Sequence, residues 1–444
     1  MSASPRPDLA PRLAGLPLAA FRGTLGGRLW SKRWFVLTAL LGAAIAVVDL
    51  LWLQRFRSGG PLTVDESGYI GIATSNADAL RQHGPWALVQ DVVNQHYEAP
   101  LVPLLAGLLE VGIASRAPLA AFGVLPLASF VVVLATYAVA RRLVPPAWSC
   151  VAAVMVGCIP ELVTYSRFFE FAVPATAAMM LAVWALLESD ALGNRGWAIA
   201  FGVAAGLLPL TRTMTVAFLP GLALAAVLQI AVHRRRGSIV NLALASVAAI
   251  LTAATWYGAN ARYVAYYLLH FGYGSDANSF GASHSLFSWG FWSKEAGVMI
   301  SGLNAPLAAV GAVGIAAAAC VLLSRGASRR GELLRAILRS DSFVLLLVLA
   351  EGYLVLSSSR NVGTGFDLPL LPLAITLSVV GAARLGREWR SRGRHLAVIF
   401  AIAAIAASLV ALVSTSDLVD GLSTTNVSVP GFGSQPLITA GGKL

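Results

Sequence analysis

Long apolar runs separated by short polar segments dominate this chain of 444 residues. A helix needs about 20 consecutive apolar residues to cross the hydrocarbon core of a bilayer. Runs near that length occur at 35–54, 119–140, 147–164, 170–188, 196–212, 214–232, 240–258, 300–323, 342–358, 367–383 and 395–414. The pattern predicts an all-α, polytopic membrane protein with about eleven transmembrane helices, several of them rich in Gly and Ala.

One further apolar stretch, 100–115, is too short to span a bilayer. As a helix it would rise about 24 Å, against a hydrocarbon core of about 30 Å. If it did span, the arginine cluster at 234–236 would lie outside, against the positive-inside rule. We therefore expect a non-spanning interfacial or re-entrant helix here.

Basic residues set the predicted orientation. With a cytoplasmic N-terminus, most of the 32 Lys and Arg residues lie on the cytoplasmic side, in 1–34, 141–142, 195, 234–236, 324–341 and 384–394. Two long segments then lie outside, 55–118 and 259–299, and we expect both to contain interfacial helices. The second is crowded with aromatic residues, which is typical of an interfacial belt.

The resulting division is a cytoplasmic segment at 1–34, a transmembrane domain at 35–414 and an extracytoplasmic tail at 415–444. The tail is rich in Gly, Ser and Thr, and it either remains flexible or covers a site. The Ala- and Arg-rich composition fits a GC-rich bacterium, so we expect a multi-pass protein of the bacterial plasma (inner) membrane.

Composition narrows the class of function. The chain is 57% hydrophobic and 12% charged, against about 25% charged residues in a soluble domain. The net charge of +11 belongs to membrane-flanking loops, so nucleic acid is not an expected partner, whereas membrane lipids are. Cys150, Cys158 and Cys320 all lie in apolar runs, and we expect buried thiols rather than disulfides or a metal site.

Asp65 and Glu66 form an acidic pair shortly after the first apolar run. Ionisable groups close to the membrane are costly, so those that persist usually have a role. Adjacent residues cannot point the same way from regular structure, so one would face a cavity while the other pairs elsewhere. The alternative is a solvated helix start.

The segment His96–Pro103 opens the interfacial helix. His96 and Glu98 could bind a metal or a substrate hydroxyl, or could simply cap and anchor the helix. In the outer turn Tyr165–Glu170, Arg167 either pairs with Glu170 three residues on or borders a cavity.

Two arginines at predicted outer helix ends suit an anionic ligand. Arg212 is the only Lys or Arg between Arg195 and Arg234, and Arg360 follows another span. A guanidinium binds phosphate in a bidentate manner, although snorkelling to lipid headgroups is the alternative. His270, in the second outer segment, is a weaker candidate.

The sequence contains no phosphate-binding loop, no dinucleotide glycine fingerprint and no zinc-spaced Cys/His set. A donor already dissolved in the bilayer would suit this architecture. A transporter or flippase of a lipid-linked or anionic substrate is the rival, but it would be expected to carry more acidic residues at mid-helix.

Four segments resemble the GT-C superfamily of membrane glycosyltransferases, in particular its aminoarabinose transferase and protein O-mannosyltransferase branch. They are Asp65–Tyr69, Tyr97–Leu101, Tyr165–Arg167 and Trp256–Arg262. The second has Ala99 where the family usually has Lys, and Thr255 stands where a Pro usually precedes the fourth.

The resemblance implies an inverting, polyprenyl-phosphate-dependent hexosyl- or pentosyltransferase of the cell envelope. Asp65 would be the general base, with Glu66 beside it. Substrate binding would involve Tyr69, His96, Tyr97, Glu98, Arg167, Arg212, His270 and Arg360. The expected partners are a polyprenyl-phosphate-linked sugar donor and a glycan or glycolipid acceptor, with protein a less favoured acceptor. Some relatives bind a divalent metal, but Ala99 departs from their pattern, so no metal is assigned.

Overall fold

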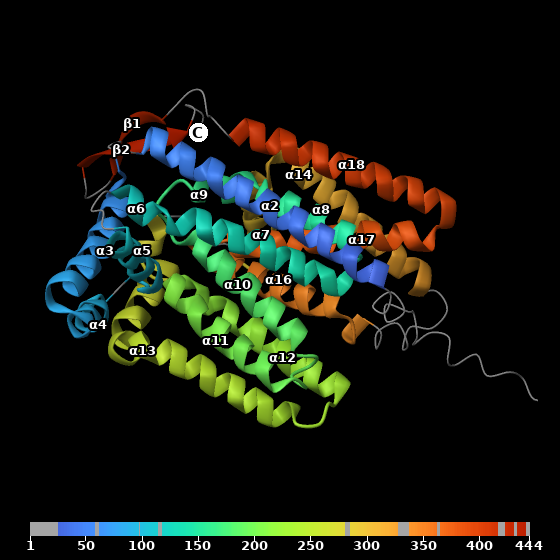
Figure 1. Ribbon diagram of the computed structural model, residues 1–444, viewed down its shortest axis with the longest axis horizontal. Coiled ribbons are helices and arrows are strands. Elements are labelled where there is room, and N and C mark those ends of the chain that lie inside the picture. The colour runs from blue at the N-terminus through green and yellow to red at the C-terminus, as the bar shows by residue number, and fades with distance from the viewer. Residues whose placement is uncertain are drawn as a thin grey trace, which may run out of the picture.

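The computed structural model describes residues 25–57, 62–96, 98–113, 118–279, 285–326, 337–361, 365–415, 422–429 and 433–440. These segments form a bundle of roughly parallel and antiparallel helices (Figure 1). Side chains are described for most of the bundle but not for residues beyond 415.

The helices that run along the bundle axis are α2 (Leu25–Phe56), α7 (Val124–Leu143), α8 (Pro146–Gly157), α10 (Ala172–Glu188), α11 (Arg195–Thr211), α12 (Leu219–His233), α13 (Ser238–Gly272), α14 (Trp289–Gly326), α16 (Asp341–Ser358), α17 (Leu371–Glu388) and α18 (Arg390–Thr415). Each corresponds to one of the predicted runs, so the polytopic all-α architecture is confirmed.

Among the described residues, eight helical segments are long and apolar enough to cross a membrane. By contrast, α8, α10 and α11 are shorter apolar helices, so the number of crossings stays a prediction. Residues of two of these short helices lie deep in the bundle: Met179 on α10 and Leu208 on α11 are fully buried. Burial inside the bundle explains how these elements form without a full membrane-length run.

A second group of elements gathers at one end of the bundle. It contains α3 (Val64–His83), α4 (Pro85–Asn94), α5 (Leu101–Gly112), α6 (Pro118–Phe122) and α9 (Pro160–Tyr165) (Figure 1). The 12-residue α5 packs on α3 and does not reach the length of a span. The expected short helix in the first long segment is therefore present.

The second long segment differs from its prediction. The helix α13 continues without a break to Gly272, well past the expected helix end at 258. A loop with the short helix η3 (Asp276–Ser279) follows, and α14 begins at Trp289. The aromatic residues expected in a loop, among them Tyr263 and Tyr267, therefore stand on a rigid helix.

Close contacts between small residues join the helices, as expected for membrane bundles. A Cβ added at Gly202 on α11 would lie 2.1 Å from the carbonyl oxygen of Ala245 on α13. Only a glycine at that position allows the two backbones to approach so closely.

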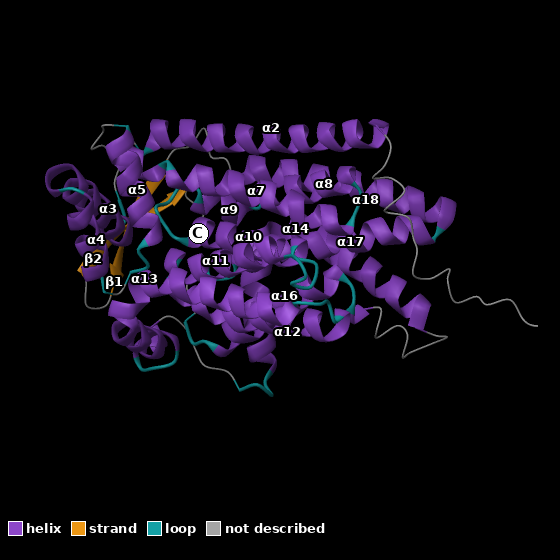
Figure 2. Cartoon of the chain, turned by 60° about the horizontal axis from the view of Figure 1, so that its bottom comes forward, coloured by secondary structure: helices purple, strands orange, loops and turns teal. Residues whose placement is uncertain are grey.

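Two local features were not predicted. Within α14, Asn304 adopts a positive φ of 59° two residues before Pro306, and its Oδ1 accepts a bond from Leu307 N, which caps a new helical segment. The tail forms an antiparallel hairpin of β1 (Leu422–Val429) and β2 (Gly433–Ala440). Figures 1 and 2 place the hairpin at the same end as α3–α6.

The cysteine expectation was wrong in one case. Cys150 and Cys158 are buried, but Cys320 is exposed on α14. That face of α14 carries other exposed apolar residues, such as Val313. A position in an apolar run therefore does not by itself predict burial inside the protein.

Candidate functional site

The start of α3 separates the two adjacent acids. Thr63 caps the helix in a capping box, in which its hydroxyl accepts from Glu66 N and the Glu66 carboxylate accepts from Thr63 N. Glu66 is fully buried, where it also forms an ion pair with Arg57 and accepts a 2.9 Å bond from Phe169 N. Asp65, one residue earlier, is exposed.

Glu66 is therefore an anchor that ties α3 to the end of α2 and to the turn before α10. Its oxygens are occupied by three donors from three parts of the chain. These contacts indicate a structural role for Glu66 and not the catalytic role expected for it. The prediction that the two acids face different ways is confirmed.

The carboxylates of Glu98 and Glu170, from separate segments, lie close to the exposed Asp65. Burial and the negative charge of Asp65 raise the pKa of the Glu98 carboxyl to about 7, although the positive charge of Arg212 lowers it. Burial likewise raises the pKa of Glu170, in the turn before α10, to about 7; Arg212 opposes this, while Asp65, Glu66 and Glu98 add to it. Because the charge of Asp65 acts on both Glu98 and Glu170, the three carboxylates lie around one polar region.

Aromatic side chains border the same region. Tyr69, one turn after Asp65 on α3, lies with its ring centroid 4.4 Å from that of Phe171. Burial raises the pKa of the Tyr69 hydroxyl, and the charges of Glu98, Glu170 and Asp65 add to the effect. Carboxylates with aromatic faces can bind the hydroxyl groups and the apolar face of a sugar ring.

Arg212 supplies positive charge to this acidic region. It lies at the junction of α11 and η2 (Thr213–Phe218), in extended backbone with φ −154°. Its charge acts on Glu98 and Glu170, and its Nη1 donates a 2.9 Å bond to Gly365 O. The arrangement places a guanidinium, able to bind a phosphate, beside carboxylates able to accept a proton.

His96 joins the first long segment to α13. Its Nδ1 lies 2.7 Å from Oδ1 of Asn260, and its ring stacks on Tyr263 at 4.4 Å between centroids. The neighbouring Gln95 carbonyl accepts a 2.8 Å bond from Trp256 Nε1. These contacts favour the anchoring interpretation of His96 and hold Glu98 close to α13.

Arg167 lies inside the protein rather than at the polar region. Its Nε donates to Asp49 Oδ1 at 2.9 Å, and its guanidinium covers the ring of Trp52 at 4.9 Å. Only 2% of Arg167 is exposed. It therefore joins the turn before α10 to α2, and its carboxylate partner is Asp49 and not Glu170.

The remaining candidates are placed as follows. His270 packs on the ring of Tyr266 near the end of α13. The backbone N of Arg360 donates a 3.0 Å bond to Gly272 O, which ties the segment after α16 to α13. Tyr97 lies outside the described residues.

No three His, Cys, Asp or Glu side chains within the described residues form a group that could hold a metal ion. The charge of Asp65 thus acts on Glu98 and Glu170 without the three carboxylates forming a ligand set. We assign no metal to the polar region.

An apolar groove of about 630 Å³ lies next to the polar region. It runs between α4 and α5 on one side and α11 and α13 on the other, and its lining includes Val92, Leu101, Leu210 and Trp256. Trp256 is also the residue that bonds to Gln95, so the groove ends close to His96 and Glu98. Such a groove suits a hydrocarbon chain rather than a polar ligand.

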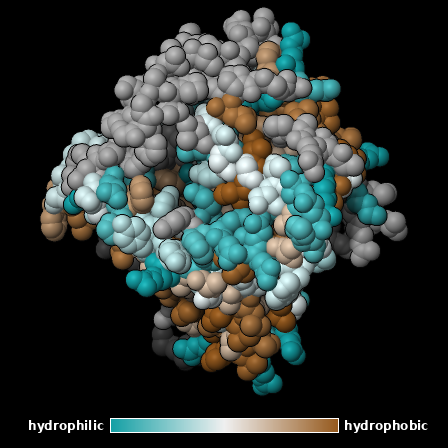
Figure 3. Space-filling view, turned by 90° about the vertical axis from the view of Figure 1, so that its left-hand side faces the viewer, coloured by the Kyte–Doolittle hydropathy of each residue, from teal (hydrophilic) through white to brown (hydrophobic). Residues whose placement is uncertain are grey.

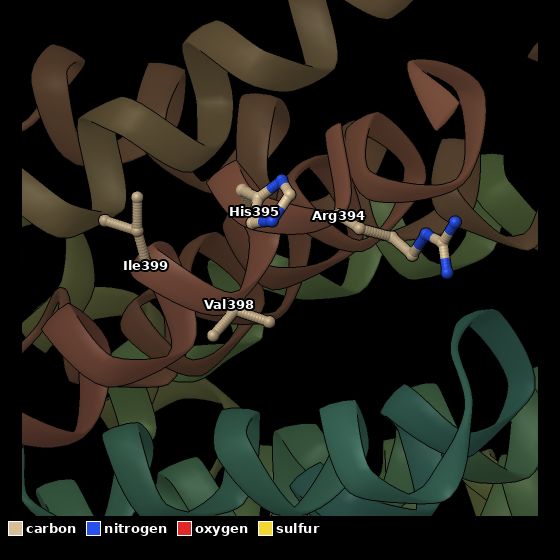
Figure 4. Close-up of a pocket in the computed structure, with 4 residues that line it drawn as sticks. All are labelled: Arg394, His395, Val398 and Ile399. Carbon is tan, nitrogen blue, oxygen red and sulfur yellow. The ribbon is translucent and has the colours of Figure 1, made fainter. Parts of the chain in front are cut away.

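The end of the molecule that carries α3–α6 is shown in Figure 3. Hydrophilic residues form a band across the middle of this face, with hydrophobic residues below it. A second pocket, of about 480 Å³, lies instead at the start of α18 around Arg394, His395, Val398 and Ile399 (Figure 4). None of the groups of the polar region lines it.

No protein-family model matches the sequence, and no curated protein matches it. Similarity appears in solved structures. ArnT from Cupriavidus metallidurans in the apo state is 19% identical, with a TM-score of 0.55 over 81% of this chain and 61% of that protein. The same protein bound to undecaprenyl phosphate gives 18% identity and a TM-score of 0.54, over 85% of this chain and 70% of the other.

The archaeal oligosaccharyltransferase AglB from Archaeoglobus fulgidus, in complex with an inhibitory peptide and a dolichol-phosphate, is 12% identical with a TM-score of 0.55. The match covers 88% of this chain and 56% of AglB. The chain has the GT-C fold. It spans less than two thirds of the length of apo ArnT and of AglB.

Two residues of the polar region were missed in the sequence analysis. Glu170 was considered only as a partner for Arg167, and Tyr267 only as part of an aromatic belt. The charges of Glu98, Arg212, Asp65 and Glu170 all act on Tyr267. Glu170 could have been found from its place three residues after the Tyr165–Arg167 motif. No sequence signal pointed to Tyr267, because the continuation of α13 was not foreseen.

Proposed function

We propose that this protein is an inverting glycosyltransferase that moves a monosaccharide from a polyprenyl-phosphate donor to an extracytoplasmic acceptor of the bacterial cell envelope. A glycolipid or polysaccharide is the favoured acceptor, ahead of protein. The observation that carries the proposal is the convergence of Asp65, Glu98 and Glu170 with Arg212 at one end of a GT-C fold. ArnT and AglB, which share the fold, are described in complex with undecaprenyl phosphate and dolichol-phosphate.

In this mechanism Asp65 is the general base. Its exposed carboxylate takes the proton from an acceptor hydroxyl while that oxygen forms a bond to the anomeric carbon. The bond from the anomeric carbon to the phosphate oxygen breaks, and its electron pair leaves with the lipid phosphate. A carboxylate within hydrogen-bond reach contributes about 10²–10⁴-fold to such a step.

Arg212 would bind the phosphate of the leaving group. A guanidinium beside the departing phosphate stabilises the negative charge that develops there. The apolar groove between α4, α5, α11 and α13 would hold the isoprenoid chain, because it ends close to Glu98 and lies on the lipid-facing side of α13, where Leu251 is 66% exposed. Tyr69 and Glu170 would contact the sugar.

The test uses purified full-length protein with a radiolabelled polyprenyl-phosphate monosaccharide, with and without a cell-envelope glycolipid. A transferase releases lipid phosphate and labels the acceptor, and transfer requires the acceptor. A flippase moves the donor across a vesicle membrane and never cleaves it. Movement without cleavage would overturn the proposal in favour of transport.

A further inference from the structure

A segment distant in sequence holds the Arg212 side chain in place. The carbonyl oxygen of Gly365 accepts from Nη1 of Arg212 at 2.9 Å. The ring of Phe366 lies under the guanidinium, with Cζ 4.0 Å from the ring centroid. The two contacts fix one edge and one face of the same planar group.

Gly365 adopts a backbone conformation that residues with a side chain rarely adopt. Its φ is +76°, a conformation that favours glycine. A Cβ at this position would lie 2.9 Å from Cβ of Ala172 and 2.9 Å from the ring of Tyr165. The turn is therefore pressed against α10 and the end of α9, and this close approach brings the Gly365 carbonyl to Arg212.

The start of the same segment is also anchored. Arg360 N and the Ser359 hydroxyl both donate to Gly272 O at the end of α13, at 3.0 and 3.2 Å. Lys294 on α14 donates to the carbonyl oxygen of Ser359. The described parts of the segment are thus tied to α13, α14 and α10.

The chemistry of the two contacts is significant. Recognition of phosphate by a guanidinium depends on the direction of its N–H groups. The carbonyl and the aromatic ring orient the group and are themselves uncharged. The carboxylates of Asp367 and Glu161 attract Arg212, as do those of Glu98 and Glu170, so the two uncharged contacts hold the guanidinium among several acidic groups.

We propose that Gly365 and Phe366 are positioning residues that orient the Arg212 guanidinium for the phosphate of the lipid donor. This inference rests on the proposed function in so far as Arg212 takes that phosphate. Phe366 acts only through Arg212, so its effect must vanish when Arg212 is absent.

The test measures binding of undecaprenyl phosphate to the purified full-length protein by tryptophan fluorescence. Phe366→Leu and Phe366→Met remove the ring, and Phe366→Tyr keeps it. Loss of a cation–π contact predicts affinity roughly 2- to 30-fold weaker for Leu and Met, with Tyr restoring the wild-type value. In an Arg212→Ala background, neither Phe366→Leu nor Phe366→Met should weaken binding further.

The outcomes separate this inference from the proposed function. If wild-type protein does not bind undecaprenyl phosphate, the proposed function fails. If wild type binds and Arg212→Ala weakens binding while both ring-removing variants keep wild-type affinity, only the positioning role fails. The same loss from Phe366→Met with and without Arg212 would show a merely structural role and would equally overturn it. Thermal unfolding of each variant confirms that folded protein is compared.

Discussion

At the scale of single residues, the neighbours Asp65 and Glu66 have different roles because the first turn of α3 directs their side chains differently. Successive residues of an α-helix differ in direction by about 100°. The capping box fixes the rotation of α3, which directs Glu66 to Arg57 and Phe169 and leaves Asp65 exposed. An anchor and a candidate base therefore depend on the same cap.

The buried carboxyl of Glu98 predicts a pH-dependent stability. Its pKa rises from 4.5 in an exposed chain to about 7 in the folded protein, so between these values the folded state holds a proton that the unfolded state loses. The free energy of unfolding must then fall as the pH rises from about 4.5 to about 7.

Glu98→Gln removes this titration. We expect the free energy of unfolding of the variant, relative to wild type, to increase between about pH 5 and pH 8 by about 1–3 kcal/mol, allowing for partial exposure. Thermal unfolding in detergent at both pH values measures the change. An equal difference between the two proteins at both values would contradict the proposed burial of this group.

At the scale of elements, the lengths of the apolar runs identified the helices but not where they end. All of the predicted runs contain a helix, because lipid and protein interior both require apolar side chains. The end of α13 was placed at 258 instead of Gly272, because Tyr263 to Tyr267 are amphipathic and fit a helix or a loop equally well. The break at Asn304 was missed because one Pro inside an apolar run does not reveal which residue before it bends.

The close packing of α11 on α13 predicts that a larger residue at their contact destabilises the protein. Gly202→Ala places a Cβ against the Ala245 carbonyl and should destabilise the protein by roughly 1–3 kcal/mol through overpacking. The matched control is Gly258→Ala on α13, where an added Cβ meets nothing within 4 Å. Thermal unfolding compares them, and equal melting temperatures would show that this contact does not hold the two helices.

At the scale of the whole molecule, the two ends of the bundle differ in charge. The candidate site lies at the end with α3–α6 (Figure 3). The other end carries Arg142, in the last turn of α7, which pairs with Glu188 and Asp341, and Arg235, which pairs with Asp190. The positive-inside rule predicts that this second end faces the cytoplasm.

Cysteine accessibility tests that orientation. In a background with Cys320→Ser, we expect Ser67→Cys to react with a membrane-impermeant maleimide in intact cells, and Arg236→Cys to react only after the membrane is opened. Both parent residues are exposed. Labelling of positions 67 and 236 from the same side of the membrane would contradict the proposed topology.

The sequence predicted several residues of the candidate site but few of the contacts that hold them in place. Asp65, Glu98 and Arg212 could be proposed because charged residues near apolar runs are unusual. The contacts of Arg212 with Gly365 and of Glu66 with Phe169 join positions more than 100 residues apart, and local patterns carry no information about such pairs.

The central claim is that Asp65 takes the proton of the acceptor hydroxyl, and one measurement tests it directly. Transfer of labelled sugar by purified Asp65→Asn is compared with wild type and with Asp190→Asn, which removes an exposed carboxylate at the other end of the bundle. We predict that Asp65→Asn loses about 10²–10⁴-fold in transfer rate while it stays folded and binds undecaprenyl phosphate, and that Asp190→Asn keeps its rate. Near-normal transfer by folded Asp65→Asn would contradict the account.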